Sequence, residues 1–195
     1  MDHYLDIRLL PDADFGPPVL MNALYTKLHR ALAAQQRQDI GVSFPGYQLA
    51  PQERNGKRPP PTLGLTLRLH GSAAALDGLM ARRWLSGFAD HAIVGDIRPA
   101  PAGANAVNVR RRQAKSSPAR ERDRLMRRQG INAEEARRRI PDEAAQRLNL
   151  PYLTVDSAST GQSFRLFVEQ QAAPGISAGS FNAYGLSAAA SLPAW

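Results

Sequence analysis

The first hundred residues show two kinds of hydrophobic periodicity in a fixed order. Four short segments alternate between apolar and other residues, as half-buried strands do, and these are 4–10, 40–44, 63–69 and 92–97. Between them lie two segments with apolar residues at helical spacing, 17–36 and a run that Ser72 caps. The order β-α-β-β-α-β is typical of the ferredoxin-like arrangement, with two helices on one face of an antiparallel sheet. We therefore predict the α+β class, with a ferredoxin-like domain at residues 1–98.

The second half of the chain predicts a mixed domain. A stretch rich in proline and small residues, 99–106, indicates a linker before a second domain at 107–195. Ser117 followed by Pro118 marks the start of a helix over 118–129, and Gly130 marks its end. The other predicted elements are strands at 107–113, 152–157, 163–169 and 181–187, a helix at 132–140 and a short helix or turn at 141–149.

The net charge is concentrated in one segment. The chain has 25 Lys and Arg against 17 Asp and Glu, a formal net charge of +8. Twelve of these bases and four of the acids fall within residues 110–139, so this segment carries the whole excess and the rest of the chain is balanced. All but one of the twelve bases are arginine, which suits forked contacts to phosphate and guanine. This concentration favours a polyanionic partner over a generally solvated surface.

Within the predicted helix at 118–129, Arg120, Arg124 and Arg128 follow one another at a spacing of four residues, with Arg127 beside them. This spacing places them on one face of the helix, where like charges repel unless an anion neutralises them. A helix of this kind fits the major groove of a duplex or the open end of an RNA hairpin. The pattern predicts nucleic acid as the partner and does not separate DNA from RNA.

Several classes of protein are excluded by what the sequence lacks. It has no cysteine, which excludes a disulfide scaffold, a cysteine-based zinc site and a thiol nucleophile. It has neither an apolar run of the ~20 residues that span a membrane nor a basic leader. It also has no cluster of carboxylates, and its four histidines are far apart. We therefore expect a cytoplasmic protein with no metal site, no cofactor and no membrane contact.

RNA offers a route to cleavage without a metal, because its own 2′-hydroxyl can attack the adjacent phosphate when a general base removes the proton. His29 lies at the border of the apolar stripe of the first helix and is a candidate base, although such a position also suits an ordinary half-buried histidine. Ser157 and Ser159 precede a predicted strand and could bind phosphate or hydroxyl. Phe164 and Tyr184 would ordinarily be core residues. From the residues alone, the protein is a basic RNA- or DNA-binding protein.

Six strings together carry a more specific signal. They are MDHYLDIRL, KLHRAL, GVSFPGY, RRQAKSSPARERDRLMRRQGINAEEARRRIP, STGQSFRLFV and FNAYGLS, in this order along the chain. Their order and spacing resemble the CRISPR repeat-processing endoribonucleases of type I-F systems, within the repeat-associated RNA-endonuclease superfamily. The resemblance implies an arginine-rich helix that enters the major groove at the base of a short repeat hairpin. It also implies metal-independent cleavage that leaves a 2′,3′-cyclic phosphate.

The resemblance further implies roles for particular residues and partners. His29 would be the general base, Tyr184 would orient it, and Ser157 would hold the attacking 2′-hydroxyl. The RNA-binding residues would be Arg111, Gln113, Arg120, Arg124, Arg127, Arg128, Ser159 and Phe164. Arg111 and Gln113 match a pair that reads guanine and adenine edges, and Phe164 matches an aromatic that stacks on the stem-loop. The family's proteins stay bound to the mature guide RNA and join a surveillance complex, so we expect a monomer when free and other subunits as partners. The alternatives are a non-catalytic RNA- or DNA-binding module that uses the same helix, and a basic subunit that docks on protein.

Overall fold

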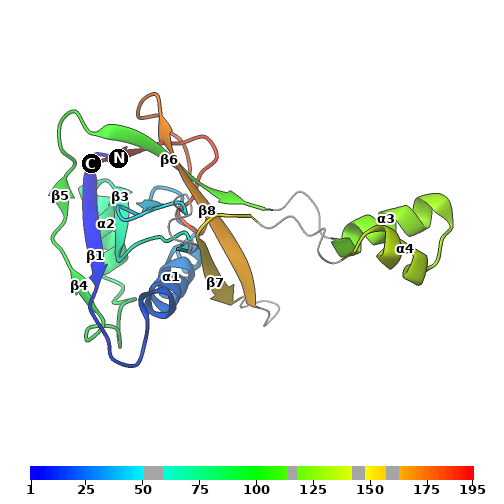
Figure 1. Cartoon of the computed structure of the whole chain (residues 1–195). Coiled ribbons are helices and arrows are strands. Elements are labelled where there is room, and N and C mark those ends of the chain that lie inside the picture. Colours follow the sequence, from blue (N-terminus) through cyan, green and yellow to red (C-terminus); the bar gives the residue numbers. More distant parts are fainter. Residues whose placement is uncertain (51–58, 114–117, 142–147, 157–162) are drawn as a thin grey trace. The chain divides into compact units, whose positions relative to one another are not determined.

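The computed structural model describes residues 1–50, 59–113, 118–141, 148–156 and 163–195. Contacts between residues divide the chain into two units (Figure 1). One unit comprises residues 1–112 and 150–195, and the other comprises residues 113–149. The larger unit contains both β-sheets, and the smaller one contains two helices.

The first sheet contains five strands. They are β1 (His3–Leu9), β2 (Gly41–Ser43), β3 (Thr66–Gly71), β4 (Ala92–Val94) and β5 (Arg98–Pro99). Four of them lie in the order β2-β3-β1-β4, and β5 extends the pairing of β1. All of these pairs are antiparallel. In β1 the alternation predicted from the sequence is observed, because Leu5, Ile7 and Leu9 are buried between more exposed neighbours.

Two helices accompany this sheet. Helix α1 (Pro17–Ala34) begins with prolines, which suit a first turn because its N–H groups have no partner within the helix. Helix α2 (Ala73–Met80) is capped by Ser72, whose Oγ accepts a hydrogen bond from the N–H of Ala75 at 3.1 Å. The order of the first six elements is therefore the predicted one, and the α+β class is confirmed. The narrower ferredoxin-like assignment stays a prediction.

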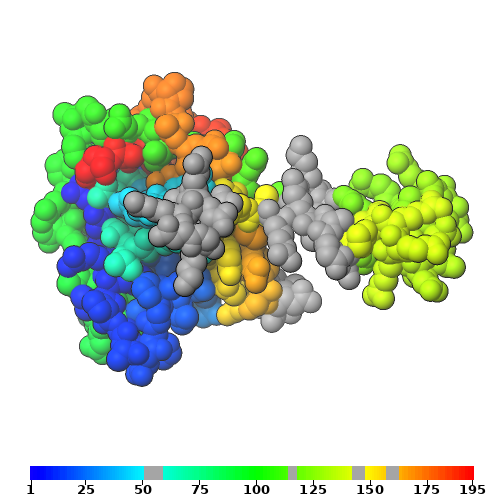
Figure 2. Space-filling view, in the orientation of Figure 1, coloured from blue at the N-terminus to red at the C-terminus, as the bar shows by residue number. Residues whose placement is uncertain are grey.

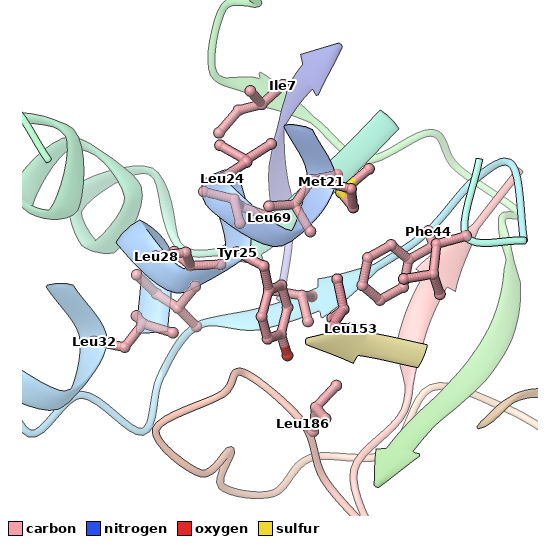
Figure 3. Packing of buried hydrophobic residues seen from close by; sticks show 14 of the residues in the cluster. Ile7, Met21, Leu24, Tyr25, Leu28, Leu32, Phe44, Leu69, Leu153 and Leu186 are labelled. Carbon is pink, nitrogen blue, oxygen red and sulfur yellow. The ribbon is translucent and has the colours of Figure 1, made fainter. Parts of the chain in front are cut away.

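The second sheet contains β6 (Asn105–Arg112), β7 (Tyr152–Asp156), β8 (Ser163–Ala173) and β9 (Leu192–Ala194). Its strands are antiparallel and lie in the order β7-β8-β6-β9. Side chains from both sheets and from α1 belong to one hydrophobic cluster, as Figure 3 shows for Leu24, Leu69 and Leu153. The predicted linker at 99–106 lies where β5 ends and β6 begins, and the division into domains 1–98 and 107–195 stays a prediction.

One predicted element is wrong. Residues 181–187 were expected to form the last strand, but they form a turn, and the final strand is β9. Phe181 and Leu186 are both buried, although a strand would place them on opposite faces because five positions separate them. Asn182 and Gly185 bend the backbone between them, since the N–H of Gly185 bonds to the carbonyl of Asn182 at 2.8 Å.

The smaller unit consists of α3 (Pro118–Gln129) and α4 (Ala133–Arg139), and Figure 2 shows their outer surface in lime. The bounds of α3 are those predicted, and Asn132 caps α4 as predicted, its Oδ1 accepting from the N–H of Glu135 at 2.8 Å. Arg139 ties the helices together, because it donates to Gln129 and to Glu135 at 2.6 Å each. Most of the helix or turn predicted at 141–149 lies outside the described residues. In the part of the chain that the structure covers, no helix has both the length and the apolar character to cross a bilayer.

Candidate functional site

His29 lies against the turn formed by residues 181–187. Its Nδ1 is 2.8 Å from the carbonyl oxygen of Ala183. A carbonyl oxygen can only accept a hydrogen bond, so Nδ1 must carry the proton of this bond. In the neutral imidazole the lone pair is then on Nε2. The turn therefore fixes the tautomer that leaves Nε2 able to accept a proton.

Tyr184 lies flat against the same imidazole. The two ring centroids are 4.1 Å apart, and the rings are inclined by only 7°. The hydrogen bond to Ala183 and the stacking on Tyr184 restrain His29 in two different directions. The structure thus brings together two of the three residues predicted to be catalytic, although 155 positions separate them in the sequence.

The turn that carries Tyr184 is closed by its own side chain and backbone bonds. The Oδ1 of Asn182 accepts from the N–H groups of Tyr184 at 2.9 Å and Leu186 at 3.2 Å. Gly185 adopts a φ of +69°, and a Cβ atom there would lie 2.8 Å from Cγ1 of Val42. The carbonyl of Gly185 also accepts from the N–H of Val42 at 2.9 Å, which attaches the turn to β2. A left-handed glycine in close contact with a strand leaves no room for another residue.

Tyr25 holds the turn from the core side. It precedes His29 by one helical turn, is completely buried, and donates its hydroxyl to the carbonyl of Tyr184 at 2.6 Å. Figure 3 shows this hydroxyl pointing out of the cluster on the side where Leu186 lies. Burial raises the pKa of the Tyr25 hydroxyl, so the hydroxyl stays protonated and remains the donor of this hydrogen bond. Tyr25 was not among the residues predicted to be functional. Its spacing of four residues from His29, which places both on one face of the helix, was the signal in the sequence that could have identified it.

Ser157 and Ser159, predicted to contact the RNA backbone or its hydroxyl groups, lie outside the described residues. The strand that precedes them, β7, ends at Asp156. It lies beside α1, since the N–H of Thr154 donates to Oδ1 of Asn22 at 3.0 Å. In Figure 3 the strand that carries Leu153 runs in the same general direction as α1 does from Met21 to Leu32.

Arg111 and Phe164 are brought together on the second sheet. Cζ of Arg111 is 5.3 Å from the centre of the Phe164 ring, a distance typical of cation–π contacts. In the antiparallel register Arg111 is opposite the buried Val168, and Phe164 is opposite the buried Val155, so both lie on the core-facing side of the sheet. Among the described residues, none accepts a hydrogen bond from the buried Nε of Arg111. Gln113 follows the end of β6 and is exposed.

The other predicted RNA-binding residues belong to α3. None of the side chains of this helix, all of which are described, is buried, and Arg120, Arg124, Arg127 and Arg128 are all exposed. Arg122 points toward α4 instead, because its Nε donates to the carbonyl of Ile140 at 2.7 Å. The Nε of Arg127 donates to the carbonyl of Asp123 at 3.2 Å, and the role of these arginines in RNA binding stays a prediction. Among the described residues, no three His, Asp or Glu side chains gather closely enough to hold a metal ion.

Comparison with known proteins gives the family. The family model described as "CRISPR-associated protein (Cas_Csy4)" matches residues 4–195. Two curated proteins named "CRISPR-associated endonuclease Cas6/Csy4" align over 194 residues, which is 99% of this chain and 99% of each of them. The protein from Pseudomonas aeruginosa (strain UCBPP-PA14) is 47% identical, and the one from Escherichia coli (strain UTI89 / UPEC) is 40% identical. The chain therefore belongs to a class of CRISPR-associated proteins, the Cas_Csy4 family, and the resemblance seen in the sequence is confirmed.

Proposed function

We propose that this protein is an endoribonuclease that cleaves CRISPR repeat RNA at the base of its hairpin. Membership of the Cas_Csy4 family and the word endonuclease in the names of both relatives support the enzymatic activity. The segment of 110–139, with its excess of arginine, supports a nucleic acid as the substrate. The observation that carries the mechanism is the hydrogen bond from Nδ1 of His29 to the carbonyl of Ala183.

In the proposed reaction, Nε2 of His29 removes the proton of the 2′-hydroxyl next to the scissile phosphate. The 2′-oxygen forms a new bond to phosphorus while the bond from phosphorus to the 5′-oxygen of the next nucleotide breaks. The departing 5′-oxygen takes up a proton, and the products are a 2′,3′-cyclic phosphate and a 5′-hydroxyl. Attack in line with the leaving group needs fixed positions of base and nucleophile, and this sequence of steps does not require a metal ion.

The remaining residues have positioning roles in this proposal. Tyr184 orients the imidazole of His29 by stacking on it. Ser157 holds the 2′-hydroxyl, and Ser159 contacts the RNA nearby. The direction of β7 supports this assignment, because the strand begins beside the first turns of α1 and leads toward the half of the helix that carries His29.

The RNA hairpin is recognised by two sets of residues. Arg111 and Gln113 read base edges below the stem, with Phe164 stacking beside Arg111. Arg124 and Arg128 enter the groove of the stem, and two further arginines of α3 contact phosphates, Arg120 and Arg127. The cleaved guide RNA stays bound, and the protein, a monomer when free, joins the other subunits of a type I-F surveillance complex.

The test is cleavage of the repeat hairpin in buffer that contains EDTA. We expect the wild-type protein to cleave and His29→Ala to bind the hairpin without cleaving it. A second histidine variant, His3→Gln, changes a residue of β1 outside the proposed site and serves as the matched control. A substrate with a 2′-deoxy group at the scissile nucleotide should remain intact. Cleavage by His29→Ala, or of the deoxy substrate, would refute the mechanism.

A further inference from the structure

A basic groove lies along the second half of α1. It has a volume of about 890 Å³ and is formed by α1, the chain that follows it and the segment after α2. The residues of this basic groove that the argument uses are Lys27, Arg30, Arg37, Asp39, Arg82 and Trp84. Its volume lies in the upper part of the range of ligand sites, which is ~300–1,000 Å³.

The groove is strongly cationic. It contains four cations and one acid, Asp39, whose carboxylate accepts two hydrogen bonds from Arg37 at 2.8 and 2.6 Å. For Arg30 and Arg82, the structure shows no carboxylate partner among the residues that it describes. Outside 110–139 the chain carries equal numbers of bases and acids, so this local excess is not a property of the surface in general. A concave cationic surface of this kind attracts a polyanion.

An aromatic side chain stands among these cations. Trp84 is half-buried and lines the groove. Lys27 connects α1 to the segment after α2, because its Nζ donates to the carbonyl of Ser86 at 2.9 Å. Proteins that bind single-stranded nucleic acid combine cations along the backbone with aromatic rings on which bases stack. The chemistry of the groove therefore fits a single strand better than a duplex or an isolated phosphate.

The groove and His29 are on the same helix. Consecutive residues of an α-helix are about 100° apart around its axis, so Arg30 lies about 100° and Lys27 about 160° from His29. Arg30 is exposed, and it is the residue of the groove that follows His29 in the sequence. A helix with its side chains is ~10–12 Å wide, so a single RNA strand of a few nucleotides is long enough to cross from His29 to the groove.

We propose that the basic groove binds the single-stranded RNA on the 3′ side of the cleaved bond. The inference rests on the proposed function, in which His29 marks the scissile phosphate and the hairpin on the 5′ side is held by Arg111, Gln113 and α3. The strand on the other side of the phosphate carries no hairpin and continues past Arg30. The groove would retain this strand until cleavage and release it afterwards as the product with the 5′-hydroxyl.

The experiment compares two uncleavable hairpins, both with a 2′-deoxy group at the scissile nucleotide. One ends just after that nucleotide, and the other continues for about six single-stranded nucleotides, within the ~4–16 that one single-strand site covers. We expect the extension to tighten binding about tenfold at low salt. If three phosphates are contacted, the dependence of log K on log salt should steepen by about 2, at ~0.7 per phosphate of a single strand.

The double variant Arg30→Gln/Arg82→Gln should lose this added affinity and the added salt dependence, while it binds the bare hairpin as the wild type does. The matched control, Arg8→Gln/Arg83→Gln, removes the same charge from residues that do not line the groove and should keep both. The proposal that the groove binds RNA is refuted if the extension adds no affinity to the wild type, or if Arg30→Gln/Arg82→Gln retains the added affinity. It is equally refuted if that variant instead loses only its binding to other protein subunits. Failure to bind the bare hairpin would count against the proposed function instead, so the two failures are distinguishable.

Discussion

Replacing Tyr25 by phenylalanine should slow RNA cleavage while leaving RNA binding intact. The variant keeps the buried ring and removes only the hydroxyl that donates to the carbonyl of Tyr184 at 2.6 Å. That carbonyl belongs to the turn whose neighbouring carbonyl, on Ala183, bonds to His29. The phenylalanine therefore loosens the backbone that fixes the imidazole, without changing any residue proposed to touch RNA.

The size of the effect follows from the energy of one hydrogen bond. Its loss costs about 1 kcal/mol, and up to about 3 kcal/mol if the carbonyl of Tyr184 is left buried and unpaired. For a chain of this size we expect Tm to fall by roughly 2–4 °C per kcal/mol. If about 1.4 kcal/mol of this loss destabilises the conformation of the turn that positions His29, the rate of cleavage falls about tenfold.

The assay is single-turnover cleavage at saturating RNA, measured together with hairpin affinity and thermal unfolding. The matched control is Tyr47→Phe, because the hydroxyl of Tyr47 also meets a backbone carbonyl, that of Val168, but at 3.4 Å and away from His29. The control should cleave like the wild type. If Tyr25→Phe lowers Tm but cleaves at the wild-type rate, the hydrogen bond stabilises the fold without positioning His29, and the reasoning is wrong.

Two further changes test other parts of the structure. Asn182→Ala removes the acceptor of two N–H groups in the turn, so it should lower the cleavage rate at unchanged hairpin affinity; weaker hairpin binding would instead indicate that the turn contacts RNA. His70 is fully buried with its Nε2 at 2.8 Å from Oγ of Ser43, and burial, helped by the charge of Arg68, lowers its pKa from 6.5 to about 3. The pKa of His70 is lower in the folded state than in the unfolded state. The contribution of the neutral, buried His70 to the free energy of unfolding is therefore complete above pH 6.5 and is lost as the pH falls toward 3. Between pH 6.5 and 5 the loss is about 2 kcal/mol. The stability difference between wild type and His70→Gln, measured by urea unfolding, should therefore shrink over this range. A difference independent of pH would contradict the assignment.

Elements whose signals are local could be predicted from the sequence. The bounds of α3 are the predicted ones, because a proline in the first turn and a glycine after the last one act on the backbone locally, as Pro118 and Gly130 do. Strand β1 follows from alternation, since Leu5, Ile7 and Leu9 are buried between more exposed neighbours. The family resemblance likewise rests on strings whose residues can be read directly, and the family model and the two relatives confirm it.

Features that depend on contacts between distant segments could not be predicted in this way. Residues 181–187 were predicted to form a strand, and only the bonds of Asn182 and the contact of Gly185 with Val42 show that they form a turn. The last strand, β9, was not predicted because it contains Pro193, which is tolerated there since β9 is at the edge of its sheet. Tyr25 has the pattern of an ordinary core residue, and its role depends on a partner 159 positions away.

The way the turn is anchored has a consequence for how activity is lost on heating. Phe181 and Leu186, at either side of Ala183 and Tyr184, are buried in the main hydrophobic cluster, and Gly185 is bonded to β2. Segments that open separately from the rest of a protein have few buried contacts and many exposed backbone bonds, and this turn has the opposite character. The stacked pair of His29 and Tyr184 should therefore persist up to the cooperative unfolding transition of the larger unit. In kinetic terms, thermal inactivation should be limited by the global unfolding of that unit and not by an earlier, local event at the site.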